Sequence, residues 1–246
     1  MKDEPITSIP VELGMMAPLT TLTLFGYAAA ARPWAFLQMG LAQPALQRTA
    51  GLRFWKLLGS GYGQGFSLQP NWGRYGLLAV WETPQAAEQF FAASTLIEAY
   101  RRHAAEIWTI YLLPVQAHGL WSGQNPFRPL AALPVEGPVA ALTRATIRPQ
   151  RLLPFWRAVP ATSRALAAAP GLLASIGIGE APLVRQATFS LWRSAADLKA
   201  FAYQNSAHKD AIRRTRTEDW YQEELFARFV PLRSTGLWDG HDPLCA

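Results

Sequence analysis

The sequence contains an internal repeat that covers most of its length. The octet GLWSGQNP at residues 119–126 returns near the end of the chain as GLWDGHDP at residues 236–243. A repeat of about 120 residues is too long to be one unit of a solenoid, so it indicates duplication of a whole small fold. Positions where the two copies differ in chemistry are candidates for the functional site. Other matches pair Gly51-Leu52 with Gly171-Leu172, Gly59-Ser60-Gly61 with Gly177-Ile178-Gly179, Trp81 with Trp192, Arg101-Arg102 with Arg213-Arg214, Trp108 with Trp220, and Pro114 with Pro231.

The composition is that of a folded protein with a large core. Half of the 246 residues are hydrophobic and 16% are charged, which excludes a disordered chain. Cys245 is the only cysteine, so no disulfide can form within the chain, and we expect a cytoplasmic protein. The sequence shows no secretory signal pattern. The formal net charge of +6 favours acidic partners, but no run of five basic residues or RNA-binding signature occurs, so we expect no nucleic-acid partner.

Proline and glycine cluster at residues 122–138, which predicts a linker between the two copies. We therefore expect an extension at 1–18, a first half at 19–121 and a second half at 139–246. Each half shows the order βαββαβ, the ferredoxin-like unit. Two such sheets packed face to face predict an α+β protein, a dimeric α/β barrel fused into one chain. The expected strands are 19–26, 54–61, 75–81 and 109–113, then 139–147, 172–179, 184–192 and 227–230; the expected helices are 33–50 and 152–169, with further helices beginning after Thr83 and Ser194.

One difference between the two halves is His208 in the second helical region. When the second helical regions are aligned on the Arg-Arg pair and the following tryptophan, His208 falls opposite Leu96. At helical spacing, Ala211, Ile212 and Thr215 share the face of His208, beside a strongly basic flank. Such a face suits a flat apolar cofactor with acidic edges, and haem is one. A lone histidine on a helix is nevertheless more often an ordinary, partly buried residue, and spacing alone leaves both readings open.

Several long motifs resemble one family. They are residues 54–57 (FWKL) leading to GSG, 140–146 (AALTRAT), 176–180 (IGIGE), and Ser206-Ala207-His208 with EEL at 223–225 and ARF at 227–229. The resemblance is to spheroidene monooxygenase, the acyclic carotenoid 2-ketolase, and it extends from about residue 22 to residue 243. It implies a monooxygenase that contains haem b, takes O₂ and electrons from reduced ferredoxin, and oxidises C-2 of acyclic carotenoids.

The resemblance also implies roles for particular residues. His208 would be the axial iron ligand, with Ile212 on the same helix face. The basic residues proposed to hold the haem propionates are Lys209, Arg213, Arg214 and Arg216. The candidates for a polar catalytic group on the other side of the haem are Arg144, Arg185 and Gln186. Three alternatives stay open: a non-catalytic haem or tetrapyrrole-binding protein, a cofactor-free monooxygenase on the same barrel, and a carrier of apolar ligands.

The helix predicted after the first strand carries no charge between Arg32 and Arg48. The simpler interpretation is that this helix packs on its sheet. The alternative is a peripheral contact with the inner face of the membrane, where a carotenoid would be taken up.

Overall fold

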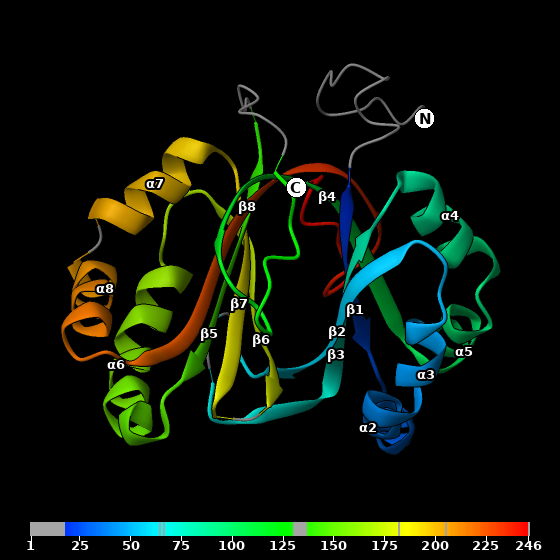
Figure 1. The fold of residues 1–246 in the computed structure, drawn as a ribbon, viewed down its shortest axis with the longest axis horizontal. Coiled ribbons are helices and arrows are strands. Elements are labelled where there is room, and N and C mark those ends of the chain that lie inside the picture. Colours follow the sequence, from blue (N-terminus) through cyan, green and yellow to red (C-terminus); the bar gives the residue numbers. More distant parts are fainter. Residues whose placement is uncertain are drawn as a thin grey trace.

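Antiparallel strands close into one barrel, with helices packed on its outside (Figure 1). The computed structural model describes residues 18–63, 65, 67–129, 137–181, 183–204 and 206–245, without the side chains of 204, 206–209, 211 and 212. The predicted extension at 1–18 therefore lies outside the described residues except for its last position. The α+β class is confirmed.

Both halves have the element order β, α, β, β, α, β. The first half contains β1 (Leu19–Gly26), α2 (Arg32–Leu41), α3 (Gln43–Gln47), β2 (Leu52–Gly61), β3 (Pro70–Trp81), α4 (Pro84–Ala93), α5 (Thr95–His103) and β4 (Glu106–Gly119). The second half contains β5 (Val139–Ile147), α6 (Leu152–Ala167), β6 (Leu172–Ala181), β7 (Arg185–Trp192), α7 (Ala195–Gln204), α8 (Ser206–Thr217) and β8 (Tyr221–Gly236). Short 3₁₀ turns, Ala29–Ala31 and Pro149–Arg151, precede α2 and α6.

The strands follow one another around the barrel as β1-β3-β2-β6-β7-β5-β8-β4. Each half therefore contributes four adjacent strands in the same relative order. The halves meet along a long β4–β8 ladder and a short β2–β6 contact, in which Gly59 pairs with Gly179 and Ser60 with Ile178. Closure through these two ladders turns the two four-stranded sheets into one barrel.

Local sequence explains the helix boundaries. The helix predicted over 33–50 is two helices, because Pro44 lacks the N–H that would continue the ladder and α3 starts around it. The predicted caps are present: Thr83 Oγ1 accepts from the Ala86 amide at 3.2 Å, and Ser194 Oγ accepts from the Asp197 amide at 3.1 Å.

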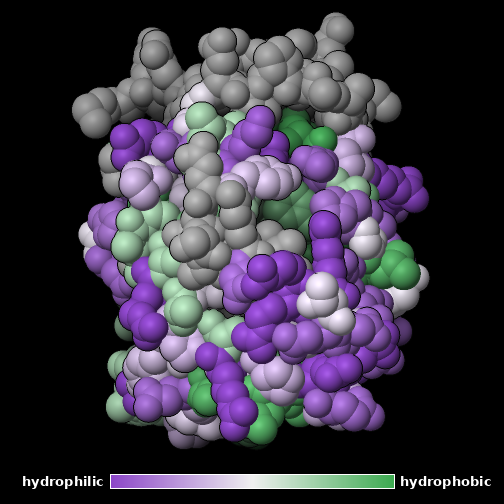
Figure 2. Space-filling view, turned by 90° about the vertical axis from the view of Figure 1, so that its left-hand side faces the viewer, coloured by the Kyte–Doolittle hydropathy of each residue, from purple (hydrophilic) through white to green (hydrophobic). Residues whose placement is uncertain are grey.

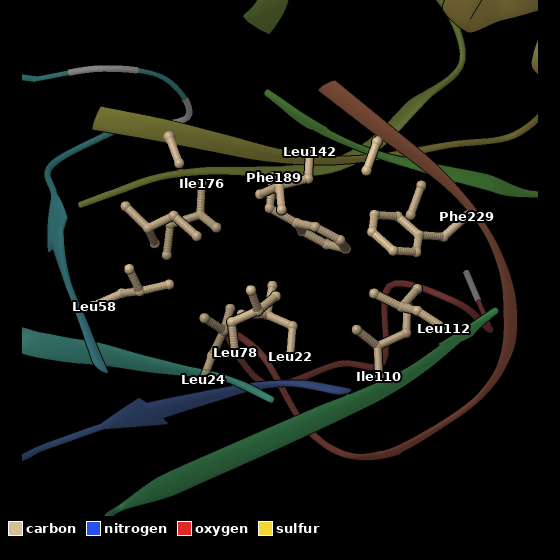
Figure 3. Close-up of a cluster of buried hydrophobic side chains, with 14 of the residues drawn as sticks. Leu22, Leu24, Leu58, Leu78, Ile110, Leu112, Leu142, Ile176, Phe189 and Phe229 are labelled. Carbon is tan, nitrogen blue, oxygen red and sulfur yellow. The ribbon is translucent and has the colours of Figure 1, made fainter. Parts of the chain in front are cut away.

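Apolar side chains fill the barrel. Leucine, isoleucine and phenylalanine from both halves meet between the strands, as Figure 3 shows for Leu22, Leu78, Ile110, Phe189 and Phe229. The inward residues alternate with outward residues that face the helices. The barrel interior is therefore a packed core, and a large ligand has to bind elsewhere.

The repeated GLW octets each close the barrel over the opposite half. Gly123 N donates to Glu223 Oε1 at 2.7 Å, and Gly240 N donates to Glu106 Oε1 at 2.9 Å. The glycine that opens each octet has φ of 86° or 83°, and a Cβ there would lie within 2.2 Å of a backbone oxygen of the facing strand. The start of the predicted linker is part of this structure, because Phe127 is buried in the barrel core.

Candidate active site

The outward sheet faces of the two halves differ at their centres. Leu19 pairs with Trp81 and Val139 pairs with Trp192, so Thr23 and Thr143 occupy equivalent positions in β1 and β5. Thr23 is buried and shares a 3.0 Å hydrogen bond with Thr109. Thr143 is exposed although it lies on a strand paired on both sides and on the helix-covered face. Among the described residues, the position over Thr143 is therefore uncovered in the second half, and we call this position the hollow; the equivalent position over Thr23 is filled.

Most residues around Thr143 are smaller or more polar than their equivalents in the first half; the exception is Phe226, which stands where the first half has Thr109. Gly177, Thr188, Thr143 and Phe226 lie side by side across four strands. The strand pairings define equivalent positions in the two halves. At these positions the first-half residue and its second-half counterpart are Leu57 and Gly177, Leu77 and Thr188, Phe25 and Ala145, Tyr75 and Gln186, and Tyr111 and Arg228. Four of these five changes shorten the side chain and reduce the cover over Thr143, and the fifth replaces a tyrosine by an arginine of similar length.

This register corrects two sequence matches. Sequence similarity matches Gly177 with Gly59. The strand pairing instead makes Gly177 the equivalent of Leu57, which lies two positions earlier in β2. Glu106 and Glu223 are equivalent, so Trp108 corresponds to Leu225 and not to Trp220. The alignment of Leu96 with His208 used that tryptophan and loses one of its two anchors.

Aromatic and aliphatic side chains border the hollow on two sides. One cluster includes Leu166, Trp192 and Leu198, and the other includes Phe155, Val159 and Trp220. In the first half, the described residues of the same layer form a single continuous cluster. Helix α8 lies against α6 on this side of the molecule (Figure 1).

Arg228 on β8 belongs to this face and was not predicted as a site residue. It pairs with Ala141, which faces the helices. Its Nε is buried and has no hydrogen-bond partner among the described residues. A buried guanidinium nitrogen without a partner is costly, so this position suits an anionic ligand group. The sequence signal is the change from Tyr111 to Arg228, which only the register reveals.

Arg144 lies on the other side of the sheet. It is 3% exposed and faces the end of the barrel interior, where it forms an ion pair with Glu223 and approaches Glu180 Oε2 at 3.7 Å. Its guanidinium also lies 5.6 Å from the Trp121 ring. The structure therefore does not bring Arg144 together with the helix-covered face.

The other two predicted catalytic residues separate as well. Arg185 is exposed at the first position of β7. By strand alternation it lies on the same side of the sheet as Ala187 and Phe189, which face the barrel interior. Gln186 lies on the opposite side of the sheet, which faces the helices. It is 8% exposed, and its Nε2 donates a hydrogen bond to the Ala181 carbonyl at 3.3 Å. Of the three, Gln186 alone shares the face of Thr143.

The predicted cofactor residues lie on α8. The side chains of His208, Lys209 and Ile212 are outside the described residues, and only their backbone in α8 is described. Arg213 is exposed and pairs with Asp210. Arg214 Nε lies 2.8 Å from Glu218 Oε1, and its guanidinium lies 5.0 Å from the Trp220 ring. Arg216 is exposed.

The Glu223 carboxylate, which pairs with Arg144, has a lowered pKa. Burial acts to raise the pKa of Glu223, but the amides of Gly123 and Ser122 and the Arg144 guanidinium outweigh it, and the pKa lies below its usual value. Lys56 Nζ and the Trp121 indole complete this cluster at 2.9 and 2.7 Å from Glu180 Oε1. These contacts tie β2, β6 and β8 together at the barrel end, although Glu180 Oε2 and Arg144 Nε are buried without a hydrogen-bond partner among the described residues.

A separate cavity of about 270 Å³ lies between the β2–β3 hairpin, β6 and the C-terminal turn. Its charged residues Arg74 and Asp239 pair with each other. Within the described residues, no cluster of three or more His, Cys, Asp or Glu is arranged to hold a metal ion. The hollow at Thr143, with its small floor, aromatic borders and unpaired Arg228, suits a flat apolar group that carries carboxylates.

The fold of this chain is similar to that of two solved aldoxime dehydratase structures. An aldoxime dehydratase in complex with butyraldoxime superposes with a TM-score of 0.55 at 12% identity, covering 87% of this chain and 79% of that one. A second aldoxime dehydratase gives a TM-score of 0.53 at 12% identity, covering 94% and 87%. The chain therefore shares the barrel fold of these proteins.

Sequence similarity is more specific. The chain is 40% identical to spheroidene monooxygenase of Rhodobacter capsulatus over 232 residues, which covers 93% of this chain and 96% of that protein. It is 42% identical to spheroidene monooxygenase of Rubrivivax gelatinosus, over 89% of this chain and 84% of the relative. No family model matches the sequence. The chain belongs to the spheroidene monooxygenase family, and it is a monooxygenase.

Proposed function

We propose that this protein is a haem-dependent monooxygenase that oxidises C-2 of an acyclic carotenoid, using O₂ and reduced ferredoxin. The observation that supports the substrate class is the identity of about two residues in five with spheroidene monooxygenases over nearly the whole chain. Two successive hydroxylations at one carbon would form a geminal diol, which loses water to leave a ketone. Each hydroxylation consumes one O₂, two electrons and two protons, and releases one water.

The difference between the halves supports haem b as the cofactor. The hollow at Thr143 has aromatic borders and a small floor, and the buried Nε of Arg228 on the same face has no hydrogen-bond partner among the described residues. These residues fit a flat macrocycle with carboxylate edges. Bound haem would supply the iron chemistry that activates O₂.

The residues of this chain would then take separate roles. His208 on α8 is the residue that would hold the haem iron. Arg228 is the preferred propionate partner, since Arg213 and Arg214 already have carboxylate partners on their own helix. Lys209, Arg216 and Ile212 remain candidates on α8. Gln186 is the preferred polar group near the substrate, because Arg144 and Arg185 lie on the side of the sheet that faces the barrel interior. The aromatic borders would exclude water from the reacting centre.

Two observations support a fused pair of ferredoxin-like units. Both halves have the same order of strands and helices, and the GLW octet of each half hydrogen-bonds to a glutamate of the other half. In this proposal the first half is the filled copy and the second half is the haem-binding copy. The hydrogen bonds to Glu106 and Glu223 would correspond to contacts between two subunits of an unfused ancestor.

Haemin titration followed by absorption spectroscopy tests the cofactor assignment. We expect the wild-type chain to give the spectrum of histidine-ligated haem and His208→Ala to lose it. Arg228→Gln should bind haemin about ten- to a hundredfold more weakly, because it loses a charge-assisted contact worth about 1.5–3 kcal/mol. Arg213→Gln is the matched control and should bind normally. An unchanged spectrum for His208→Ala would move the ligand to another residue.

Turnover tests the reaction separately. The haem-loaded protein, spheroidene, O₂ and reduced ferredoxin should yield the C-2 ketone. Stable haem binding without any oxidised product would favour a non-catalytic haem protein, whereas product formation without haem would favour a cofactor-free monooxygenase.

A further inference from the structure

The outer face of α2 is apolar and exposed, and α3 continues it without any charge. Ala35, Ala42 and Leu46 pack towards the sheet, as the simpler sequence interpretation predicts. On the opposite face, Phe36 is 54% exposed, Leu37 57% and Leu41 67%. Surface helices normally carry charged residues on their solvent face. None occurs between Arg32 and Arg48.

The β2–β3 hairpin extends this apolar surface. Tyr62, Leu68 and Trp72 are all exposed, and the Trp72 ring meets the Phe36 ring edge-on at 5.6 Å between centroids. At Gly65 the hairpin touches α6 of the second half, because a Cβ there would lie 2.7 Å from Ser163 Oγ. The hairpin, cyan in Figure 1, therefore reaches from α2 to the half that contains the candidate site.

The equivalent helix of the second half shows that this exposure is not a property of the fold. Helix α6 has Arg157 and Arg164 on its exposed face. Figure 2 shows that the side of the molecule formed by the second half is mainly hydrophilic. The apolar outer face is thus specific to the first copy.

We propose that the exposed residues of α2 and α3, together with Tyr62, Leu68 and Trp72, form a docking face that inserts into the surface of an anionic membrane. Arg32 and Arg48 are both exposed and bracket the uncharged stretch, where they can contact lipid phosphates. The net charge of +6 has the complementary sign. A half-buried helix with an apolar outer face and basic ends has the character of an interfacial helix. No helix in the described ranges is long and apolar enough to span a bilayer, so the contact would be peripheral.

This inference deepens the proposed function, because a carotenoid dissolves in lipid and has to be drawn from it. The docking face would take substrate from the bilayer, and the hairpin would lead towards the second half. The residues that carry the inference do not overlap with those proposed to bind haem, so the two ideas can fail independently.

Co-sedimentation with lipid vesicles tests the docking face without turnover. The purified full-length protein is mixed with vesicles of phosphatidylglycerol and phosphatidylcholine, or of phosphatidylcholine alone. We expect binding to the anionic vesicles. Leu41→Glu should reduce the partition coefficient about tenfold, because it places a charge where an exposed leucine would enter the lipid surface. Tyr203→Glu is the matched control, since Tyr203 is 64% exposed on α7 and the charge change is the same.

Several outcomes would overturn the proposal. Equal losses for Leu41→Glu and Tyr203→Glu would indicate general charge attraction without a docking face. Absence of vesicle binding by the wild-type protein would also reject it. Sedimentation velocity in the absence of lipid identifies a rival occupant: a dimer that Leu41→Glu dissociates would mean that a second copy covers this face. Vesicle binding without ketone formation would leave the docking face standing while the proposed reaction failed.

Discussion

Arg144 occupies the position that Leu24 has in the first half, because Thr143 and Thr23 are equivalent. It places a charge at the end of an otherwise apolar barrel and holds two carboxylates there, Glu223 and Glu180. A buried charge is tolerated only where its partners are present, so removing one partner is more damaging than its own contribution suggests. The arginine therefore has a structural role that sequence similarity alone cannot distinguish from a catalytic one.

Arg144→Met should lower the free energy of unfolding by about 2–4 kcal/mol, since it leaves Glu223 and Glu180 partly buried without their guanidinium partner. Urea denaturation gives the value. Arg185→Met is the control, because Arg185 is exposed, and it should change stability by less than about 0.5 kcal/mol. Equal effects of the two substitutions would contradict the structural role of Arg144.

At the scale of the element, the outward face of each four-stranded sheet determines whether its helices pack directly on it. The first half fills this layer with Phe25, Leu57, Leu77 and Tyr75. The second half keeps the same strands but reduces the side chains at the corresponding positions. Strand pairing depends on the backbone, so a hollow can arise without a change of fold.

Thr143→Leu and Thr23→Leu form a matched pair that tests this difference. Thr143→Leu should leave stability within about 0.5 kcal/mol but weaken haemin binding at least tenfold, because the leucine occupies the hollow. Thr23→Leu should destabilise the protein by about 1–3 kcal/mol, since it overfills a buried site and leaves Thr109 without its partner. Normal haemin binding by Thr143→Leu would place the cofactor elsewhere.

At the scale of the whole molecule, the two halves are held together by exchanged segments as well as by the barrel. The second octet donates to Glu106, and Asp242 accepts from the Trp108 indole at 2.9 Å. Burial acts to raise the pKa of Asp242, but the Ser234 hydroxyl, the Trp108 indole and the Leu244 amide outweigh it, and the pKa is lowered. The hydrogen bond from Arg74 is the largest cause of the lowered pKa of Asp239.

These lowered pKa values predict acid sensitivity. A carboxyl group whose pKa is lower in the folded than in the unfolded state contributes stability above its unfolded pKa, about 3.9 for Asp and 4.3 for Glu. That stability is lost as the pH falls through the folded value. The urea midpoint should therefore be nearly constant between about pH 5 and 8 and fall below about pH 4. Asp242→Asn should be less stable at neutral pH and lose less on acidification; an acid response equal to that of the wild type would show that Asp242 does not contribute.

Local sequence was enough to place most elements. The strands at 19–26 and 139–147 coincide with β1 and β5, since alternating apolar residues bounded by turns report directly on local backbone. The break at Pro44 was missed because apolar periodicity continues across it. The match of Gly59 with Gly177 was also misleading, because glycines recur at short intervals in both hairpins.

The sequence by itself determined the repeat, the order of elements and the family, because these depend on local patterns and on long similar motifs. Only the tertiary structure decided which residues share the helix-covered face of the second sheet. Arg144 and Gln186 look alike as polar residues on strands, yet strand parity and register send them to opposite sides. The unpaired state of Arg228 and the exposed face of α2 are likewise invisible in sequence, because a partner or a covering group belongs to the packing of distant segments.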